Sequence, residues 1–533
     1  MLSKFVDAIK EKYSAIAIIC IVGLLLYSKS FFFGFTYLDD NALILNNLPF
    51  LENIKNVFAA FKYDVFFMTH TTTAYFRPLL TISFMPEAIV GGSIPLFYHL
   101  VNVGIHLAAA SLVYVLFTKL KYTKRISLFF SLIFVVHPVL TQAIAWIPGR
   151  NDSLLAVFVL ASFIFLIDFI ETGKRAAMPW SIIFFSLALF TKESAIVLPV
   201  LGIGYLWIRN RFDKNTLLEF GSGWLIAILF WLSLRIPAMT NPLPMSLPVG
   251  VSSFLENVPG TLQLLGKVFF PFNLSVFPIQ QDTIFLWGYL ATALIIGLVL
   301  FQLKSRQTSP HSYLMMGFGF AWFLAFLWPS FVKFDPGTPD FIEHRLYIPI
   351  IGLLILLAES CVGRFLNEMD RKIFLPFSLG LLFILFCMTA TYENVFFDKT
   401  SFWKDAVSHS PHSSFAQKNL GAMYYLDHDY ALAEKYSKEA LTLNSGETMV
   451  HNNLGLIYAS QGKDIDAERE FLLEIATNPY YDNAHYNLGL LYYKKGNLKA
   501  ARTQWEDTLK TNPSYYDAYR ALQSLTYEEN KPI

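Results

Sequence analysis

The sequence predicts an all-α fold in two parts, a polytopic transmembrane helical domain followed by an α-helical repeat solenoid. Apolar runs of about 20 residues, long enough to cross a bilayer core, recur as far as residue 391. Only 15% of the residues are charged, whereas soluble domains carry about a quarter. A 34-residue periodicity begins near residue 414 and predicts the second part. The net charge of +1 gives no indication of a nucleic-acid partner.

The first part, residues 1–392, is expected to cross the membrane about eleven times. Its first apolar run follows a basic flank and is too long for a signal-peptide core, so we interpret it as a retained helix. The predicted spans lie near residues 13–34, 96–117, 126–146, 153–170, 178–191, 194–208, 218–236, 284–303, 313–331, 346–361 and 373–391.

The short basic loops predict the orientation of these spans. If the N-terminus is cytoplasmic, alternate crossings place every basic loop on the cytoplasmic side, as the positive-inside rule requires; these loops lie at 119–125, 172–175, 209–214, 303–306 and 364–372. Residues 254–272 contain Pro and Gly and would break this pattern as a span, so we expect an interfacial or re-entrant segment. The repeats then lie outside the cytoplasm. We expect the periplasm beside a bacterial inner membrane, with the lumen of the endoplasmic reticulum as the alternative.

The second part, residues 414–533, follows an expected linker at 393–413 and reads as three tetratricopeptide repeats with the start of a capping helix at 517–525. Four positions align at the 34-residue period, namely Leu420, Leu454 and Leu488, then Gly421, Gly455 and Gly489, then Tyr424, Tyr458 and Tyr492, then Ala433, Ala467 and Ala501. Small residues at such positions let two helices approach closely, and the concave face of such arrays binds peptide or protein segments.

Ionisable residues gather at the predicted non-cytoplasmic helix ends. Such residues at membrane depth are costly and favour a functional interpretation. They are Asp39, Asp40 and Arg77 in the first outer loop (35–95), His137, Arg150 and Asp152 in the second, Lys192 and Glu193 in the third, and Asp335, Asp340, Glu343, His344 and Arg345 in the last. Carboxylates beside Arg, Lys and His suggest an acid/base group next to an anion site.

These residues sit in an ordered series of segments: "YLDDNALILNN", "YFRPL", "YHLVNVGIHL", "HPVLTQAIAWIPGRND", "FTKES" and "EHRLYIPIIG". Their order, together with the outer repeats, resembles the transmembrane and tetratricopeptide-repeat-containing O-mannosyltransferases and their bacterial relatives, which are glycosyltransferases of the GT-C fold. The repeat array is shorter here than in the animal members of that family.

The resemblance implies a donor sugar on a polyprenyl phosphate and a hydroxyl acceptor, protein Ser or Thr, with inversion at the anomeric carbon. Asp39 would be the general base, and Asp40 would orient the acceptor or share the proton. The departing phosphate needs cationic stabilisation, for which the candidates are Arg345, Arg150 and Lys192, with His137 and His344 as hydrogen-bond donors and Arg77, Asp152 and Glu193 beside them. No cofactor is required, although an acidic pair could also bind a divalent metal.

Each of these residues also has a plain structural interpretation. The two aspartates could cap a helix or face water, and His137 could satisfy a helix end. Arg150 could pair with Asp152, Lys192 with Glu193, and Arg345 could extend to the interface.

Two other functions stay open. One is an oligosaccharide ligase that uses a diphosphate-linked glycan, although such enzymes use Arg and His in a large late loop, and the late loop here is short. The other is a non-catalytic, membrane-anchored repeat scaffold for envelope assembly, which leaves the one-sided charges unexplained.

Overall fold

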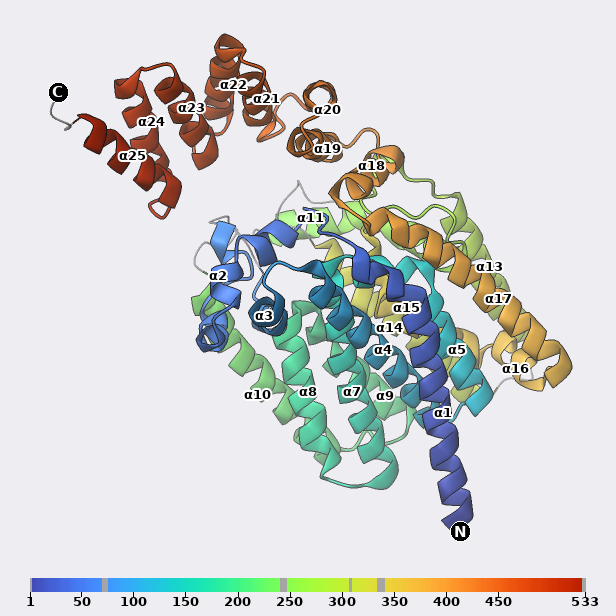
Figure 1. The fold of residues 1–533 in the computed structure, drawn as a ribbon. Helices are drawn as coiled ribbons and strands as arrows, with labels where there is room; N and C mark the ends of the chain where they lie inside the picture. The colour runs from blue at the N-terminus through green and yellow to red at the C-terminus, as the bar shows by residue number, and fades with distance from the viewer. Residues whose placement is uncertain (1, 70–74, 240–246, 306–308, 333–340, 530–533) are drawn as a thin grey trace. The chain divides into compact units, whose positions relative to one another are not determined.

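The computed structural model describes residues 2–69, 75–239, 247–305, 309–332 and 341–529, and within these ranges all regular secondary structure is helical. The chain divides into two compact units, Met1–Phe402 and Trp403–Ile533 (Figure 1). Their border lies inside the predicted linker, on the helix α18 (Lys399–His409). Asp335 and Asp340 lie outside the described residues.

The first unit is a bundle of long apolar helices joined by short helical turns (Figure 1). Its α-helices are α1 (Leu2–Tyr27), α2 (Leu48–Leu51), α3 (Pro78–Gly91), α4 (Pro95–Lys119), α5 (Lys124–Val136), α6 (Gln142–Ala145), α7 (Arg150–Thr172), α8 (Ala177–Thr191), α9 (Leu198–Ile208), α10 (Lys214–Ala238), α11 (Leu247–Asn257), α12 (Gly260–Phe269), α13 (Leu286–Ser305), α14 (Pro310–Leu327), α15 (Pro349–Glu359), α16 (Cys361–Glu368) and α17 (Arg371–Tyr392). Its single turns of other helix types are η1 (Ser28–Phe32), η2 (Asn41–Leu45), η3 (Ile54–Val57), η4 (Ala59–Lys62), η5 (Phe67–Thr69), η6 (Pro138–Leu140), η7 (Ile147–Gly149), η8 (Glu193–Val197), η9 (Gln280–Asp282), η10 (Trp328–Phe331), η11 (Glu343–Leu346) and η12 (Glu393–Phe396).

Each of the eleven predicted apolar runs is a helix or a bent helix pair, which confirms an all-α polytopic membrane domain. Seven described helices are long and apolar enough to cross a membrane, or up to nine if two bent pairs, α5 with Pro138–Ala145 and α15 with α16, each count as one span. The two remaining runs, 178–191 and 194–208, form the shorter apolar helices α8 and Glu193–Ile208. The structure therefore supports seven to nine spans by length, against the eleven expected. Which side of the membrane each loop occupies stays a prediction.

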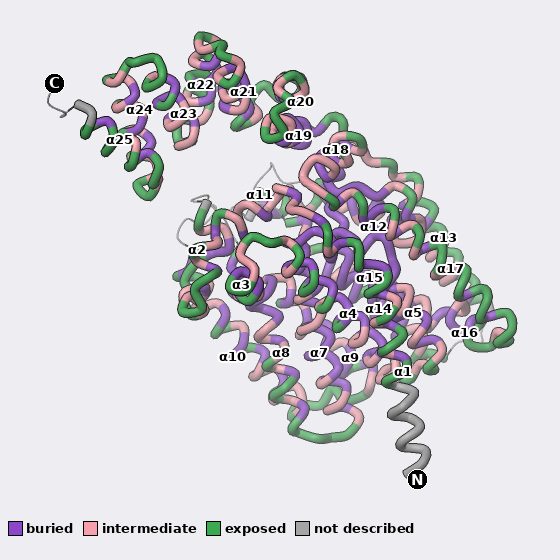
Figure 2. The backbone as a smooth tube through the Cα atoms, in the orientation of Figure 1, coloured by how far each residue is buried: buried purple, intermediate pink, exposed green. Residues whose placement is uncertain are grey.

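Glycine pairs let some of these helices touch backbone to backbone. A Cβ on Gly319 of α14 would lie 2.4 Å from the carbonyl oxygen of Gly352 on α15, and a Cβ on Gly352 would lie 2.2 Å from the carbonyl oxygen of Gly319. Between α12 and α13, a Cβ on Gly266 would lie 2.6 Å from the backbone N of Gly288, and a Cβ on Gly288 would lie 2.3 Å from the carbonyl oxygen of Leu262. Small residues at helix crossings are typical of packing within membranes. The buried residues accordingly concentrate along the centre of the unit (Figure 2).

The segment 254–272 forms neither a span nor a continuous helix. It contains the end of α11 and the whole of α12, which has ten residues, with Pro259 between the two helices. Neither helix is among those long enough to cross a membrane. Whether the segment lies in the interface or re-enters the membrane stays a prediction.

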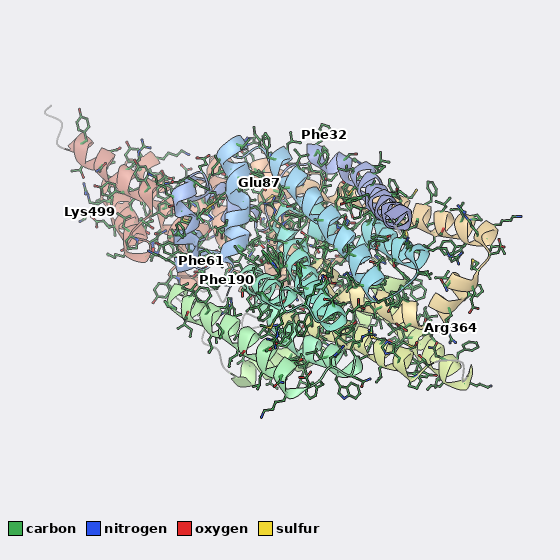
Figure 3. All side chains as sticks on the ribbon, turned by 90° about the horizontal axis from the view of Figure 1, so that it is seen from below. Phe32, Phe61, Glu87, Phe190, Arg364 and Lys499 are labelled. Carbon is green, nitrogen blue, oxygen red and sulfur yellow. The ribbon has the colours of Figure 1, made fainter. Side chains whose placement is uncertain are left out.

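The segment 35–95, which is predicted to be the first outer loop, folds over the ends of the bundle helices. Ile44, Leu51 and Leu80 pack in one buried cluster with Tyr98 of α4. Further along the loop, the rings of Phe61 and Phe190 on α8 meet edge to face with centroids 5.4 Å apart (Figure 3). The loop is thus anchored on α4 and on the end of α8, which leads directly into Lys192 and Glu193.

The second unit is an array of three antiparallel helix pairs followed by one further helix, as the repeats predict. Its helices are α19 (Ser414–Leu426), α20 (Tyr430–Leu443), α21 (Val450–Ser460), α22 (Asp464–Thr477), α23 (Asp482–Lys494), α24 (Leu498–Thr511) and α25 (Tyr516–Glu529). The aligned glycines lie where paired helices touch: a Cβ on Gly455 would lie 2.5 Å from the ring of Phe471, and one on Gly489 would lie 2.4 Å from Trp505.

Candidate functional site

Asp40 is the anchored member of the acidic pair. Its side chain is fully buried, and its Oδ2 accepts hydrogen bonds from the backbone N of Thr36 at 3.0 Å and from Thr36 Oγ1 at 2.5 Å. Burial raises the pKa of Asp40 to about 6, against the effect of the hydrogen bonds from Thr36. Within the described part of the chain, its Oδ1 has no hydrogen-bond partner.

Asp39 is the more available carboxyl group. Its side chain is partly exposed, and none of the described residues donates a hydrogen bond to it. Burial and the neighbouring charge of Asp40 raise the pKa of Asp39 to about 7, although Arg77 opposes this shift. A carboxyl group whose pKa lies near neutral pH is suited to accept a proton from a hydroxyl group.

The backbone around the two aspartates has unusual geometry. Tyr37, two residues before Asp39, has a φ of +60°, which is uncommon outside glycine. Directly after Asp40, residues Asn41–Leu45 form a single π-helical turn, a feature that occurs frequently at functional sites. Strained or rare backbone of this kind concentrates at active sites and ligand clamps.

Arg77 lies at the centre of the charged cluster. Its Nε and Nη2 donate to the two carboxylate oxygens of Glu193 at 3.1 and 2.6 Å, which is a bidentate pair. Its guanidinium also stacks 4.4 Å above the centroid of the Tyr75 ring. Burial opposes the ionisation of Glu193, but the Arg77 pair overcomes it and lowers the pKa of Glu193 to about 2.

Lys192 and Asp152 form a second ion pair beside the first. Lys192 Nζ contacts both carboxylate oxygens of Asp152, at 2.8 and 3.0 Å, and the two side chains are 11% and 7% exposed. Burial lowers the pKa of Lys192, and Asp152 counteracts that shift. Arg77 interacts electrostatically with both Asp39 and Asp152, so the four paired charges and the acidic pair form one cluster.

The turn η11 adds His344 and Arg345 to this cluster. His344 Nε2 lies 3.8 Å from Asp152 Oδ2, and its ring packs against Trp146 with centroids 5.3 Å apart. Burial and the nearby charges of Lys192, Arg345 and Arg77 lower the pKa of His344 well below its usual value, which favours the neutral form of the imidazole. Arg345 is half-buried and donates through Nη1 to the carbonyl oxygen of Ser330 at 3.2 Å.

Arg150 lies apart from this cluster and holds neighbouring helices together through its hydrogen bonds. It is fully buried; its Nε donates to Asn102 at 2.6 Å, and its Nη2 donates to the carbonyl oxygen of Tyr98 at 3.0 Å. Its Nη1 pairs with Glu87 at 2.6 Å and also donates to the carbonyl oxygen of Ser83. The geometry therefore favours the structural interpretation, with Glu87 rather than Asp152 as the ionic partner.

His137 likewise satisfies backbone groups. The backbone N of Val139 donates to its Nδ1 at 3.3 Å, and its Nε2 lies 2.9 Å from the carbonyl oxygen of Val268. These contacts cap the turn after α5 and fasten α12 to it. The geometry here also favours the structural interpretation over a substrate contact.

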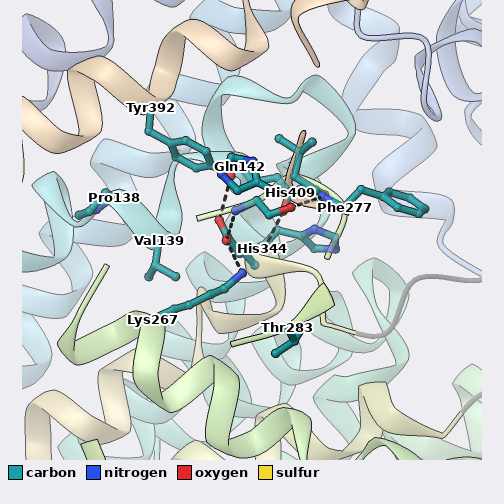
Figure 4. Close-up of polar contacts among 12 residues, drawn as sticks. Pro138, Val139, Gln142, Lys267, Phe277, Thr283, His344, Tyr392 and His409 are labelled. Atoms are coloured by element: carbon teal, nitrogen blue, oxygen red, sulfur yellow. Dashed lines mark hydrogen bonds and ion pairs between the residues drawn. The ribbon is translucent and has the colours of Figure 1, made fainter. Parts of the chain in front are cut away.

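Three further buried polar groups were not among the predicted catalytic and substrate-binding residues. Gln142, Lys267 and Glu393 are buried, and Lys267 forms an ion pair with Glu343 (Figure 4). The only sequence signal for Lys267 and Glu393 is a charged residue within or beside an apolar run, the same signal that singled out Arg345. Among the described residues, no group of three or more His, Cys, Asp or Glu side chains could hold a metal ion.

Fold and cluster together define a multi-pass helical membrane protein that carries a buried acid–base cluster at its helix ends and a helical repeat array. No family model matches the chain. Its curated relatives are named protein O-mannosyl-transferases. It is 26% identical to human TMTC4 over 466 residues, 75% of this chain and 62% of that protein. It is 29% identical to mouse TMTC4 over 230 residues, 40% of this chain and 31% of that protein.

Human TMTC2 is 28% identical over 250 residues, 41% of this chain and 29% of that protein. The predicted resemblance to this O-mannosyltransferase family is thus confirmed at modest identity. The chain spans less than two thirds of the length of each of these three relatives.

Proposed function

We propose that this protein is a membrane glycosyltransferase that moves a single hexose from a polyprenyl phosphate to a Ser or Thr hydroxyl of a protein. The names of its relatives support transfer to protein. The observation that carries the catalytic part is Asp39, an available carboxyl group with a pKa of about 7 beside an anchored second carboxyl group and a cationic cluster.

In the proposed reaction, Asp39 accepts the proton of the acceptor hydroxyl group. The hydroxyl oxygen then bonds to the anomeric carbon as the bond from that carbon to the phosphate oxygen breaks. The phosphate leaves with the bonding electron pair, and the anomeric configuration inverts. A positioned base of this kind contributes about 10²- to 10⁴-fold to the rate.

The cations for the departing phosphate are Arg345, Arg77 and Lys192. Arg77 and Lys192 already hold carboxylates, which are anions of similar geometry, in their bidentate and close contacts. Glu193 orders the guanidinium of Arg77 before the donor arrives, and the phosphate would then compete with Glu193 for the same two N–H donors. Arg345 donates to the backbone carbonyl oxygen of Ser330 and is partly exposed.

The repeat array would hold the acceptor protein or a partner on its concave face, as such arrays do. The active face would lie outside the cytoplasm, in a periplasm or a lumen, as the basic loops predict. The mechanism requires no metal or organic cofactor, since the leaving group is a phosphate whose charge the cations balance.

A transfer assay with purified protein tests this function. A short-chain polyprenyl-phosphate mannose and a Ser/Thr-rich peptide would be the substrates, and mass spectrometry would detect the glycosylated peptide. Wild type is expected to transfer the sugar, and Asp39→Asn to lose at least about 100-fold in kcat. Full transfer by Asp39→Asn, or no consumption of the donor by wild type, would overturn the proposal.

A further inference from the structure

A fully buried carboxylate lies one residue before His344 and two before Arg345. Glu343 is 0% exposed. Its Oε1 accepts from Lys267 Nζ at 2.6 Å and from the backbone N of Ser275 at 2.7 Å. Its Oε2 accepts from the hydroxyl group of Tyr392 at 3.0 Å (Figure 4). One side chain thereby joins α12, the loop after α12 and the end of α17 to the turn η11.

A second buried side chain joins the same two segments. Gln142 Nε2 donates to the carbonyl oxygen of Val276 at 3.0 Å, and the backbone N of His344 donates to Gln142 Oε1 at 3.2 Å. Ser275 precedes Val276, and Glu343 precedes His344. The contacts of Glu343 and Gln142 therefore form a closed ring that links Ser275–Val276 to Glu343–His344 (Figure 4).

This ring holds a turn that has little structure of its own. The helical turn η11 has four residues, and the backbone N of Tyr347 donates to the carbonyl oxygen of His344 at 3.1 Å. So short a turn depends on outside contacts to keep one orientation. A buried carboxylate is tolerated only with such a full set of donors, so the ring specifies a single arrangement.

We propose that Glu343 and Gln142 are positioning residues, which hold the His344–Arg345 turn in the one orientation that presents Arg345 to the donor phosphate. This inference rests on the proposed function for the identity of the phosphate. Neither side chain touches the substrate; each acts through the backbone of η11.

The second unit contains an ion pair that can serve as a matched control for Lys267–Glu343. In the second unit, Lys418 Nζ contacts Glu447 Oε1 at 2.6 Å, with side chains 7% and 12% exposed. Glu447 also accepts from Ser414 Oγ at 2.7 Å and from Asn444 at 3.2 Å. It therefore resembles Glu343 in partner, distance and number of donors, but it lies in the repeat array.

The test compares Glu343→Gln with Glu447→Gln in the full-length protein. Two readouts are needed: kcat and KM for the polyprenyl-phosphate mannose, and the Kd for bare short-chain polyprenyl phosphate. Because the negative charge that balances buried Lys267 is lost, Glu343→Gln is expected to raise both KM and Kd by about 10-fold, with kcat changed by less than about 3-fold. Glu447→Gln is expected to leave Kd within about 2-fold and to lower the thermal stability of the repeat array.

Two milder variants keep the inference testable if Glu343→Gln does not fold. Tyr392→Phe removes a single donor to Glu343, and Gln142→Met opens the other half of the ring at similar volume. Each variant is expected to raise the Kd for bare polyprenyl phosphate by about 3-fold. The double variant is expected to raise the Kd by less than the product of the two single effects, because both substitutions act on the same ring of contacts. Unchanged Kd in both variants, or strict multiplication of their effects, would overturn the positioning role.

The binding readout separates this inference from the proposed function. If wild type binds the lipid phosphate but transfers no sugar, while Glu343→Gln still loses affinity, the proposed function fails and the positioning role stands. If wild type transfers the sugar and Glu343→Gln matches it in KM and Kd, the positioning role fails alone. If wild type neither binds nor transfers, both fail.

Discussion

Asp39→Asn should lower kcat at least about 100-fold and, at the same time, make the protein more stable. In the folded protein the pKa of Asp39 is raised from 3.8 to about 7, by burial and then by the charge of Asp40. Because the folded pKa lies above the unfolded one, the folded state holds the proton more tightly, and ionising Asp39 destabilises it. This destabilisation is absent below about pH 4, grows as pH rises towards 7, and is constant above it.

The size of the effect follows from the shift. About three pKa units correspond to about 4 kcal/mol as an upper value. Asp39 is partly exposed, so solvent screening reduces this, and we expect about 1–2 kcal/mol of added stability for Asp39→Asn at pH 8. The amide has the shape of the carboxyl group but never ionises, so the gain should vanish near pH 4.

Thermal unfolding in detergent at pH 4, 6 and 8, run beside the transfer assay, measures both consequences. The N-cap residue Asp213 offers a control of opposite sign, because hydrogen bonds from Thr216 lower its pKa. Asp213→Asn should therefore lose stability at neutral pH and keep transfer activity. If Asp39→Asn were less stable than wild type at pH 8, or equally stabilised at every pH, the assignment of Asp39 as a base with a raised pKa would be wrong.

Four further predictions follow from the same structure. Wild-type kcat/KM should rise with pH up to about 7, as the base Asp39 ionises, and a pH–rate profile that is flat from 5 to 8 would contradict this. Arg77→Lys should lower kcat/KM about 10- to 100-fold, because lysine cannot form the bidentate contact; wild-type kinetics in this variant would remove Arg77 from the site. Glu87→Gln should cost about 3–5 kcal/mol of unfolding free energy by leaving buried Arg150 unpaired, and thermal or denaturant unfolding would show it. Gly489→Val should loosen the repeat array, because its Cβ would meet Trp505; hydrogen exchange should rise there, while the Kd for polyprenyl phosphate stays unchanged.

The helices and repeats could be predicted from the sequence because their signals are local. Apolar runs and the 34-residue period are properties of neighbouring residues, and every predicted run is helical in the structure. The number of spans was less secure, since α8 and α9 are short and α5 and α15 are bent against their neighbours. Length alone cannot decide whether such elements cross a bilayer.

The sequence could indicate which ionisable residues lie at helix ends, but it could not indicate which of them form ion pairs with one another. Ionisable residues at helix ends identified Asp39, Arg77, Lys192 and Arg345, yet the partner of each cation depends on tertiary contacts. Arg77 meets Glu193 across 116 positions of the chain, whereas the sequence suggested a local Lys192–Glu193 pair.

The same limitation explains Arg150 and Glu343. Arg150 lies two residues from Asp152 in the sequence, but it pairs with Glu87 from α3. Lys267 and Glu343 are separated by 76 positions and meet only in the folded bundle. Nothing in the local pattern distinguishes a cation that faces substrate from one that holds two helices together, because burial and pairing are set by distant segments.

The most direct test of the account is an experimental structure of the protein with a polyprenyl-phosphate mannose bound in lipid nanodiscs. The phosphate is expected within hydrogen-bonding distance of Arg345 and of the guanidinium of Arg77, with Glu193 displaced and the anomeric carbon facing Asp39. A donor whose phosphate lies away from both arginines would contradict the proposed function. So would a donor whose sugar is placed so that no acceptor hydroxyl group could reach the anomeric carbon beside Asp39.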